Sequence, residues 1–155
     1  MQRRSFMSVT LAAFGLGRGG GARASGGFEI TRSEAEWTAM LSPAEFRVMR
    51  KHGTERPFTS ALNDNKARGT YLCRGCALPL YASEHKFDSG TGWPSFWQAL
   101  PEAIGTRADR SLFMLRTECH CRRCGSHLGH IFDDGPPPTG KRHCINGVSL
   151  VFRAA

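Results

Sequence analysis

The sequence lacks any long hydrophobic run and any long block of basic residues. Its longest weakly apolar stretch near the amino terminus, residues 8–17, is about half of the ~20 residues that a membrane-spanning helix needs. No run of Lys or Arg is longer than Arg122-Arg123, so we expect no nucleic-acid interface. The sequence also contains no repeat, and 155 residues is the usual length of a single domain. We therefore expect one domain, with no membrane span in the mature chain.

Acidic residues are missing from the first 24 positions, which contain four arginines. The twin arginine Arg3-Arg4, the short apolar stretch and a small-x-small pattern that ends at Ala24 resemble a twin-arginine export signal. The alternative is a disordered basic tail in which the arginines are adjacent by chance. The first interpretation predicts a cleaved signal over residues 1–24, a linker over 25–32 and a folded domain over 33–155. It also predicts export to the bacterial periplasm and a mature net charge of +4 instead of +8.

Turn-forming residues are abundant, and eighteen glycines with eight prolines favour a β-rich domain. Ser33 begins a Ser-x-x-Glu capping box, which predicts a first short helix. Ser42-Pro43 predicts the start of a second helix, and Gly53 its end. Later apolar runs predict strands over 70–73, 112–119 and 144–152, and residues 133–140 predict a loop. The predicted fold class is mainly β (α+β), with short N-terminal helices on a β-rich body.

Four of the six cysteines form two Cys-x-x-Cys pairs, Cys73/Cys76 and Cys121/Cys124, with 44 residues between them. Two such turns can supply four thiolates to a tetrahedral zinc ion at about 2.3 Å, so we expect one structural zinc per chain. Two structural disulfides are an alternative for an exported protein. A redox-active Cys-x-x-Cys is a third interpretation.

Cys144 has no cysteine near it in the sequence. Period-two alternation places Arg142, Cys144 and Asn146 on one face of the predicted strand. The same alternation adds Val148, Leu150 and Phe152 to that face. A neighbouring cation and hydrogen-bond donor favour the thiolate over the thiol, which would make Cys144 reactive. The alternative is a small buried core cysteine, which is the commonest role of a lone cysteine.

Two further segments contain residue types suited to a binding or catalytic site. His127 and His130 directly follow the second cysteine pair and could serve as proton donors for a nucleophilic thiol. They could equally be loop histidines or extra metal ligands. The glycine-rich segment 90–97 displays Trp93, either as a binding platform or as the anchor of a packed loop.

Taken together, these segments resemble the methionine-R-sulfoxide reductases of the MsrB type. The resemblance runs from about Trp37 to the carboxyl terminus, and its main segments are residues 53–58, 73–76, 89–96, 121–136 and 142–146. It implies a fold of two antiparallel β-sheets with short helices and a structural zinc ion. It also implies an enzyme, a peptide-methionine (R)-S-oxide reductase that repairs oxidised proteins.

The resemblance implies a role for each matching residue. Cys144 matches the nucleophile that attacks the sulfoxide sulfur and becomes a sulfenic acid. His127 and His130 match residues that bind or protonate the sulfoxide oxygen. Arg142 and Asn146 match residues that order the active site and favour the thiolate. Trp93 matches the aromatic residue that packs on the substrate methyl group, so that the R epimer is taken.

One departure from the family concerns the resolving thiol. Many members have cysteine where this chain has Thr91, and threonine cannot resolve a sulfenic acid as a disulfide. Cys119, the only cysteine outside the other assignments, is a candidate alternative resolver, or else an aliphatic-like filler of the core. Otherwise a thioredoxin-like protein or another thiol reductant must attack Cys144 directly.

The expected substrates are oxidised proteins or peptides that contain methionine sulfoxide, and the expected oligomeric state is a monomer. Two other functions stay open at this point. One is a non-catalytic zinc-stabilised β-rich binding module, for which Cys144 would be dispensable. The other is a disulfide oxidoreductase that uses one Cys-x-x-Cys pair as a free dithiol.

Overall fold

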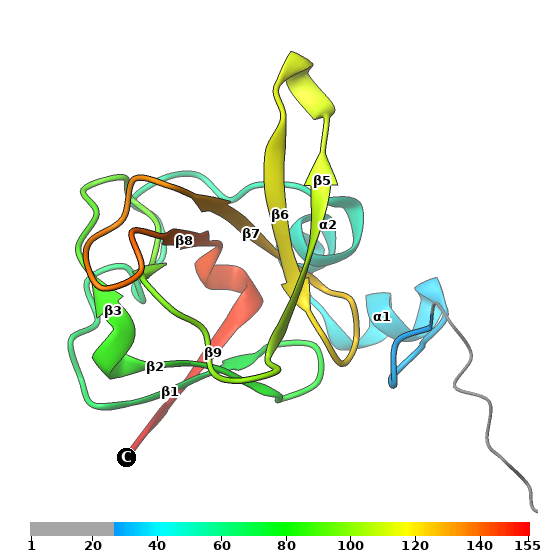
Figure 1. The fold of residues 1–155 in the computed structure, drawn as a ribbon. Helices are drawn as coiled ribbons and strands as arrows, with labels where there is room; N and C mark the ends of the chain where they lie inside the picture. Colours follow the sequence, from blue (N-terminus) through cyan, green and yellow to red (C-terminus); the bar gives the residue numbers. More distant parts are fainter. Residues whose placement is uncertain (1–26) are drawn as a thin grey trace, which may run out of the picture.

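The computed structural model describes residues 27–155 (Figure 1). The predicted export signal, residues 1–24, lies outside the described residues. The helices are α1 (Glu34–Met40) and α2 (Pro43–Lys51). The strands are β1 (Gly69–Cys73), β2 (Pro79–Ala82), β3 (Lys86–Phe87), β4 (Ser95–Phe96), β5 (Ile104–Asp109), β6 (Arg116–Cys121), β7 (His127–Phe132), β8 (Arg142–Ile145) and β9 (Leu150–Ala154). Within residues 27–155, no helix is both long and apolar enough to span a bilayer.

Both predicted helices are present, and each begins with a complete capping box. Ser33 caps α1 with Glu36, and Ser42 caps α2 with Glu45, so each Glu side chain accepts the backbone N–H of its Ser. The end of α2 differs from the prediction, because His52 rather than Gly53 adopts the left-handed C-cap conformation, with φ of 54°. The helix therefore ends one residue earlier than predicted, and the His52 side chain lies at the edge of the functional site that is described below.

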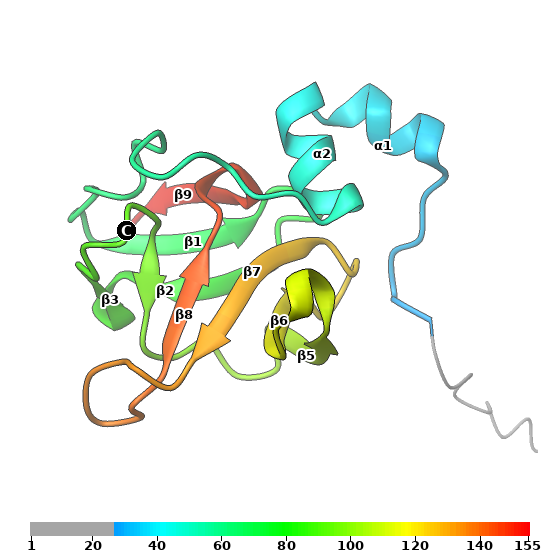
Figure 2. The ribbon, with the colours of Figure 1, turned by 90° about the horizontal axis from the view of Figure 1, so that it is seen from above.

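The strands form two antiparallel sheets, as the family resemblance implied. The first has the order β2-β1-β9, and the second has the order β3-β4-β8-β7-β6-β5. In the view of Figure 2, β7 and β8 run beside the first sheet, and α2 lies close to the start of β7. The core contains the fully buried side chains of Tyr71, Tyr81, Phe96, Leu128, Ile145 and Leu150. Tyr81 stacks on Phe96 with ring centroids 4.3 Å apart.

The predicted strand over residues 144–152 is wrong in its middle. A 3₁₀ turn, Gly147–Ser149, follows Asn146, so β8 and β9 belong to different sheets. The cause is distant in sequence, because the buried Glu55 carboxylate accepts the N–H groups of Gly147 and Val148. Val148, Leu150 and Phe152 therefore do not continue the face of β8 that carries Cys144.

The predicted strand over residues 112–119 also begins too early. Residues 111–113 form a 3₁₀ turn, and β6 starts only at Arg116. The strands β5 and β6 form a long hairpin at the edge of the second sheet, and its far end, with this turn at the tip, extends beyond the rest of the sheet (Figure 1). The predicted loop over residues 133–140 is confirmed.

Candidate active site and metal centre

The four cysteines of the Cys-x-x-Cys pairs converge at one point that connects the two sheets. Cys73 ends β1 and Cys76 follows it, whereas Cys121 ends β6 and Cys124 lies in the turn between β6 and β7. The Sγ atoms of Cys73 and Cys124 are 3.7 Å apart, and those of Cys76 and Cys121 are 3.5 Å apart. Four sulfurs at about 2.3 Å from a tetrahedral ion would lie about 3.8 Å from one another, whereas a disulfide bond is about 2.05 Å long. The cluster therefore fits a metal ion, and all four thiols are free of disulfides.

Cys144 lies on the central strand β8 and opens into a small cavity. The strand register pairs Cys144 with His130 on β7, and pairs His130 with Glu118 on β6. Residues in one such row share a face of the sheet. The cavity has a volume of about 130 Å³ and is lined by Thr54, Trp93, Arg116, Gly129, His130, Phe132, Cys144 and Asn146.

The electrostatic surroundings of Cys144 correct the expectation that it is poised to ionise. Burial raises the pKa of the Cys144 thiol, and this effect outweighs the lowering by the Arg142 charge and by hydrogen bonds from Thr91 and Arg142. Arg142 is held in place by a two-pronged ion pair with Asp134, at 2.9 Å for both contacts. Its guanidinium also lies 4.5 Å from the centre of the Phe132 ring. The free site therefore holds a thiol beside a fixed cation.

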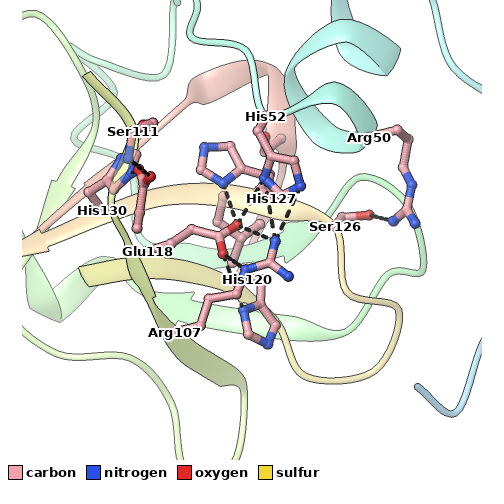
Figure 3. A network of polar contacts seen from close by, with 12 residues as sticks. Arg50, His52, Arg107, Ser111, Glu118, His120, Ser126, His127 and His130 are labelled. Atoms are coloured by element: carbon pink, nitrogen blue, oxygen red, sulfur yellow. Dashed lines mark hydrogen bonds and ion pairs between the residues drawn. The ribbon is translucent and has the colours of Figure 1, made fainter. Parts of the chain in front are cut away.

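A buried carboxylate, Glu118, organises a network of polar side chains at the β6 end of this row (Figure 3). His127 Nδ1 lies 2.7 Å from Glu118 Oε1, and both side chains are almost fully buried. A β-bulge between Cys119 and His120 brings His127 onto the same face as Glu118. Because the ionised carboxylate accepts a hydrogen bond from Nδ1–H, the ring is fixed with Nε2 free, and this atom is buried with no hydrogen-bond partner among the described residues.

Glu118 is ionised in this network. Its burial alone would raise the pKa, but hydrogen bonds from His127 and Arg107 outweigh burial and lower the pKa of Glu118 to about 2. His52 Nδ1 lies 3.2 Å from the same carboxylate. His52, Glu118 and His127 are close enough to hold a metal ion, but the Arg107 guanidinium is paired with the Glu118 carboxylate. The negative charge of Glu118 is therefore already balanced by Arg107, and these side chains form an ion-pair network without a metal ion.

His130 is held by a second carboxylate that sequence reasoning missed. Its Nε2 lies 2.8 Å from Asp109 Oδ2, and Arg116 Nη2 lies 2.7 Å from the same oxygen. Hydrogen bonds from Ser111 hold the pKa of Asp109 well below its usual range. Burial lowers the pKa of His130, so its neutral form predominates at pH 7. Asp109 lies at the end of β5, so the hairpin positions this histidine.

Comparison with known proteins assigns the chain to a family. A family model described as the SelR domain matches residues 41–154. The peptide methionine sulfoxide reductase MsrB of Thiobacillus denitrificans is 54% identical over 122 residues, which are 78% of this chain and 92% of that protein. The MsrB proteins of Methanosarcina barkeri and Pseudomonas putida are 51% and 53% identical over 125 and 127 residues. These matches cover 80% and 81% of this chain and 88% and 95% of the two proteins. The chain belongs to the MsrB family.

In this MsrB-family chain, three of the predicted site residues line the cavity around Cys144. Trp93, His130 and Asn146 are brought together there. The His127 ring lies next to the His130 ring, with ring centroids 5.4 Å apart. His127 lines a larger neighbouring cavity instead of the Cys144 cavity. The sequence predicted both histidines for the sulfoxide oxygen, whereas the structure puts only His130 against the Cys144 cavity.

Asn146 and Trp93 shape the cavity through one shared contact. Asn146 Oδ1 accepts the Glu55 N–H at 2.9 Å, and its Nδ2 donates to the Leu128 carbonyl at 3.0 Å. Trp93 Nε1 donates to the Glu55 carbonyl at 3.2 Å. Both side chains therefore fix the backbone at Glu55, and the Trp93 ring is left as a wall of the cavity.

The structure does not bring Cys119 together with Cys144, which counts against Cys119 as a resolving thiol. Cys119 pairs with Gly129, which pairs with Ile145, so Cys119 faces the core on the opposite side of the sheet from Cys144. The two cysteines are also separated by two strand spacings, roughly 10 Å in all, which exceeds the reach of a disulfide. Its thiol contacts the Tyr81 hydroxyl, and burial raises its pKa to about 12. This position matches the core-filler interpretation.

Replacing Glu118 with Gln should weaken the fold and flatten its response to acid. The pKa of Glu118 is lowered in the folded state, so its ionised form stabilises the fold above about pH 4.5, and this stabilisation is lost as the pH falls toward 2. We expect Glu118→Gln to lower the free energy of unfolding at pH 7 by about 1–3 kcal/mol. Urea unfolding at several pH values measures the effect.

A matched control is Glu34→Gln, because Glu34 forms an exposed ion pair with Lys51 at 2.7 Å. This variant should stay within about 0.5 kcal/mol of the parent. If Glu118→Gln changed stability no more than Glu34→Gln does, the network around Glu118 would have no role in holding His127.

Proposed function

We infer that this protein reduces methionine-R-sulfoxide in oxidised polypeptides to methionine, with Cys144 as the nucleophile. The observation that carries this inference is the single cavity that Cys144 shares with His130 and the Trp93 ring. A volume of about 130 Å³ equals roughly four water molecules. That is room for the sulfur, oxygen, methyl and methylene groups at the end of a methionine sulfoxide side chain. The MsrB names of the relatives support the same activity.

The proposed chemistry starts from the thiol form of Cys144. Its sulfur bonds to the sulfoxide sulfur, and the thiol proton passes to the sulfoxide oxygen, either directly or through His130. The S–O bond of the substrate then breaks as the oxygen bonds to the Cys144 sulfur, and the S–S bond breaks to release methionine, which leaves Cys144 as a sulfenic acid. Two electrons move from the Cys144 sulfur to the substrate sulfur. The Arg142 charge stabilises negative charge on the Cys144 sulfur during this exchange.

A thiol reductant completes the proposed cycle. The reductant thiol attacks the Cys144 sulfenic acid and releases water, and a second thiol then reduces the mixed disulfide. Thr91 supplies no thiol, and Cys119 faces the other side of the sheet. We therefore propose that a thioredoxin-like protein or a small thiol acts on Cys144 directly, in a monomeric enzyme.

Three further features belong to this proposal. The four-cysteine cluster holds one structural zinc ion, whose thiolate bonds join β1 to the turn between β6 and β7. Residues 1–24 direct the chain through twin-arginine export, which carries it to the periplasm. There the enzyme repairs proteins damaged by oxidants. Support for export comes from the Arg3-Arg4 pattern in the sequence.

The activity is tested with a racemic mixture of N-acetyl-methionine sulfoxides and dithiothreitol. Chromatography that separates the epimers should show complete consumption of the R epimer, while the S epimer stays intact. The physical reason is that methyl and oxygen can exchange places only by putting the polar oxygen against the Trp93 ring. Consumption of the S epimer, or of both at equal rates, would refute the assignment.

A non-catalytic zinc-stabilised binding module is the competing function. It requires neither a thiol nor a positioned histidine in the cavity, whereas the structure has both Cys144 and His130 there. Sulfoxide turnover that depends on Cys144 separates the two functions.

A further inference from the structure

The tip of the β5–β6 hairpin exposes a continuous run of large apolar side chains. The exposed fractions are 74% for Leu112, 108% for Phe113, 53% for Met114 and 75% for Leu115. Elsewhere in residues 27–155, the exposed large hydrophobic residues are single: Phe28, Met40 and Phe58. Contiguous exposed apolar surface is unusual on a soluble domain and marks interaction sites. We call residues 112–115 the apolar tip.

The backbone holds the apolar tip away from the sheets. Leu112 and Phe113 both have φ of 56°, a left-handed conformation that costs free energy in residues other than glycine. Two side-chain contacts support this turn. Ser111 N–H donates to Asp109 Oδ1 at 2.9 Å, and Arg116 Nη2 donates to Ser111 Oγ at 3.0 Å. The tip is thus a built feature, and Asp109 connects it to His130.

A larger cavity leads from the catalytic cavity to the tip. It has a volume of about 540 Å³, and Arg110, Ser111 and Leu112 form part of its wall. It shares Thr54, Arg116 and His130 with the cavity around Cys144. A third hollow, of about 380 Å³, lies among Arg110 and the apolar tip itself. The three cavities are therefore neighbours along the surface from Cys144 to the end of the hairpin, and the second and third share Arg110.

Polar groups along this path suit an extended polypeptide. Arg116 lines both of the first two cavities, and its Nε is buried with no hydrogen-bond partner among residues 27–155. The surface between Cys144 and the end of the hairpin thus combines the Arg116 side chain, which lines both cavities, with the exposed side chains of the apolar tip.

The distance from Cys144 to the apolar tip sets the spacing that a ligand needs. Cys144 and Glu118 lie in one row across the sheet and are two strands apart. Leu115 lies three residues from Glu118 in the direction of the end of the hairpin. At about 3.4 Å per residue and about 4.8 Å per strand, the separation between Cys144 and Leu115, the near end of the apolar tip, is roughly 14 Å. An extended peptide covers that distance in about four residues.

We propose that the apolar tip is a second substrate-binding surface, which takes an apolar side chain about four residues from the methionine sulfoxide in an extended segment. This proposal rests on the proposed function and names its substrate class, namely unfolded apolar segments of oxidised proteins. The small volume of the catalytic cavity fits only the end of the sulfoxide side chain. The tip supplies the additional contact area that favours a polypeptide over free methionine sulfoxide.

The test compares two peptides and two variants. Both peptides contain one methionine-R-sulfoxide, and one carries leucines four residues to each side, whereas the other carries serines there. The variant Leu112→Ser/Phe113→Ser/Leu115→Ser removes most of the apolar tip. Met40→Ser is the matched control, because Met40 is 52% exposed on α1 and lines none of the three cavities described above.

We expect wild type to favour the leucine peptide by about tenfold in kcat/KM, mainly through KM. The tip variant should lose this preference while it reduces the serine peptide and N-acetyl-methionine-R-sulfoxide within about twofold of wild type. Met40→Ser should behave as wild type does on all three. Equal rates of wild type on the two peptides, or a parallel loss on every substrate in a folded tip variant, would overturn the proposal. If the triple variant fails to fold, Phe113→Ser alone serves, since this side chain is fully exposed.

A binding measurement keeps the two proposals distinguishable. Fluorescein-labelled leucine peptide should bind Cys144→Ser about tenfold more tightly than it binds the same protein without the apolar tip, whether or not wild type shows turnover. Absence of wild-type turnover on N-acetyl-methionine-R-sulfoxide would count against the proposed function only. If the tip variant lost binding to phosphatidylglycerol vesicles but kept its peptide preference, the tip would be a membrane contact and the inference would be wrong.

Discussion

Cys144→Ser is expected to lower kcat/KM for methionine-R-sulfoxide by about 10⁴-fold or more, as the loss of a catalytic nucleophile does in other enzymes. A serine hydroxyl nearly preserves the shape of the cysteine side chain, so the cavity around position 144 should persist. Oxygen cannot take the place of sulfur, because the hydroxyl cannot accept the substrate oxygen as a stable acid. The measurement is dithiothreitol-dependent reduction of N-acetyl-methionine-R-sulfoxide.

Cys119→Ser is the control for this experiment. Cys119 is a buried cysteine on the opposite face of the same sheet, and its sulfur lies beside the Tyr81 hydroxyl. We expect its activity to stay within about threefold of wild type, with thioredoxin as well as with dithiothreitol as reductant. Comparable activity of Cys144→Ser and wild type would leave the proposed chemistry without a nucleophile.

Removing the metal should unfold the domain. Structural zinc sites contribute about 10–16 kcal/mol of apparent binding free energy in small zinc-binding peptides, and a whole domain is stable by only about 5–15 kcal/mol. We expect about one zinc per chain in the purified protein. Cys121→Ser should lose the zinc together with cooperative thermal unfolding, because Cys121 is one of the four clustered thiols that connect the two sheets.

The zinc experiment has the same control, because Cys119 lies two residues from Cys121 and outside the cluster. Metal analysis and circular dichroism on Cys119→Ser should show about one zinc and a folded domain. A Cys121→Ser protein that unfolded cooperatively at the wild-type temperature would show that the cluster is not a structural site. A free dithiol that titrates in wild type would favour a redox role instead.

The features that could be predicted from the sequence are those that depend on residues close together in the chain. The capping boxes at Ser33 and Ser42 involve residues three positions apart, and the structure has both. The two Cys-x-x-Cys turns identify four candidate metal ligands, which the structure brings together. Two antiparallel sheets follow from the family resemblance, and the loop over residues 133–140 follows from its two glycines and its prolines.

Features that depend on contacts distant in sequence could not be predicted. The break after Asn146 is caused by Glu55, more than ninety residues away. Glu118 and Asp109 show no motif, because their partners are set by strand register and by the bulge next to Cys119. The pKa of Cys144 was misjudged for the same reason, since burial by other strands outweighs the neighbouring Arg142. Acidic residues on strands next to a histidine-bearing strand are the signal that could have suggested Glu118.

The central claim is that the Cys144 sulfur takes the oxygen from a methionine-R-sulfoxide. It is tested most directly by a single turnover of the wild-type protein without any reductant, followed by mass spectrometry of the protein trapped with a sulfenic-acid reagent. We expect one methionine formed per protein chain and one trapped adduct, located on Cys144 and absent from Cys144→Ser. Methionine formed without an oxidised Cys144, or an adduct located on another cysteine, would contradict the account.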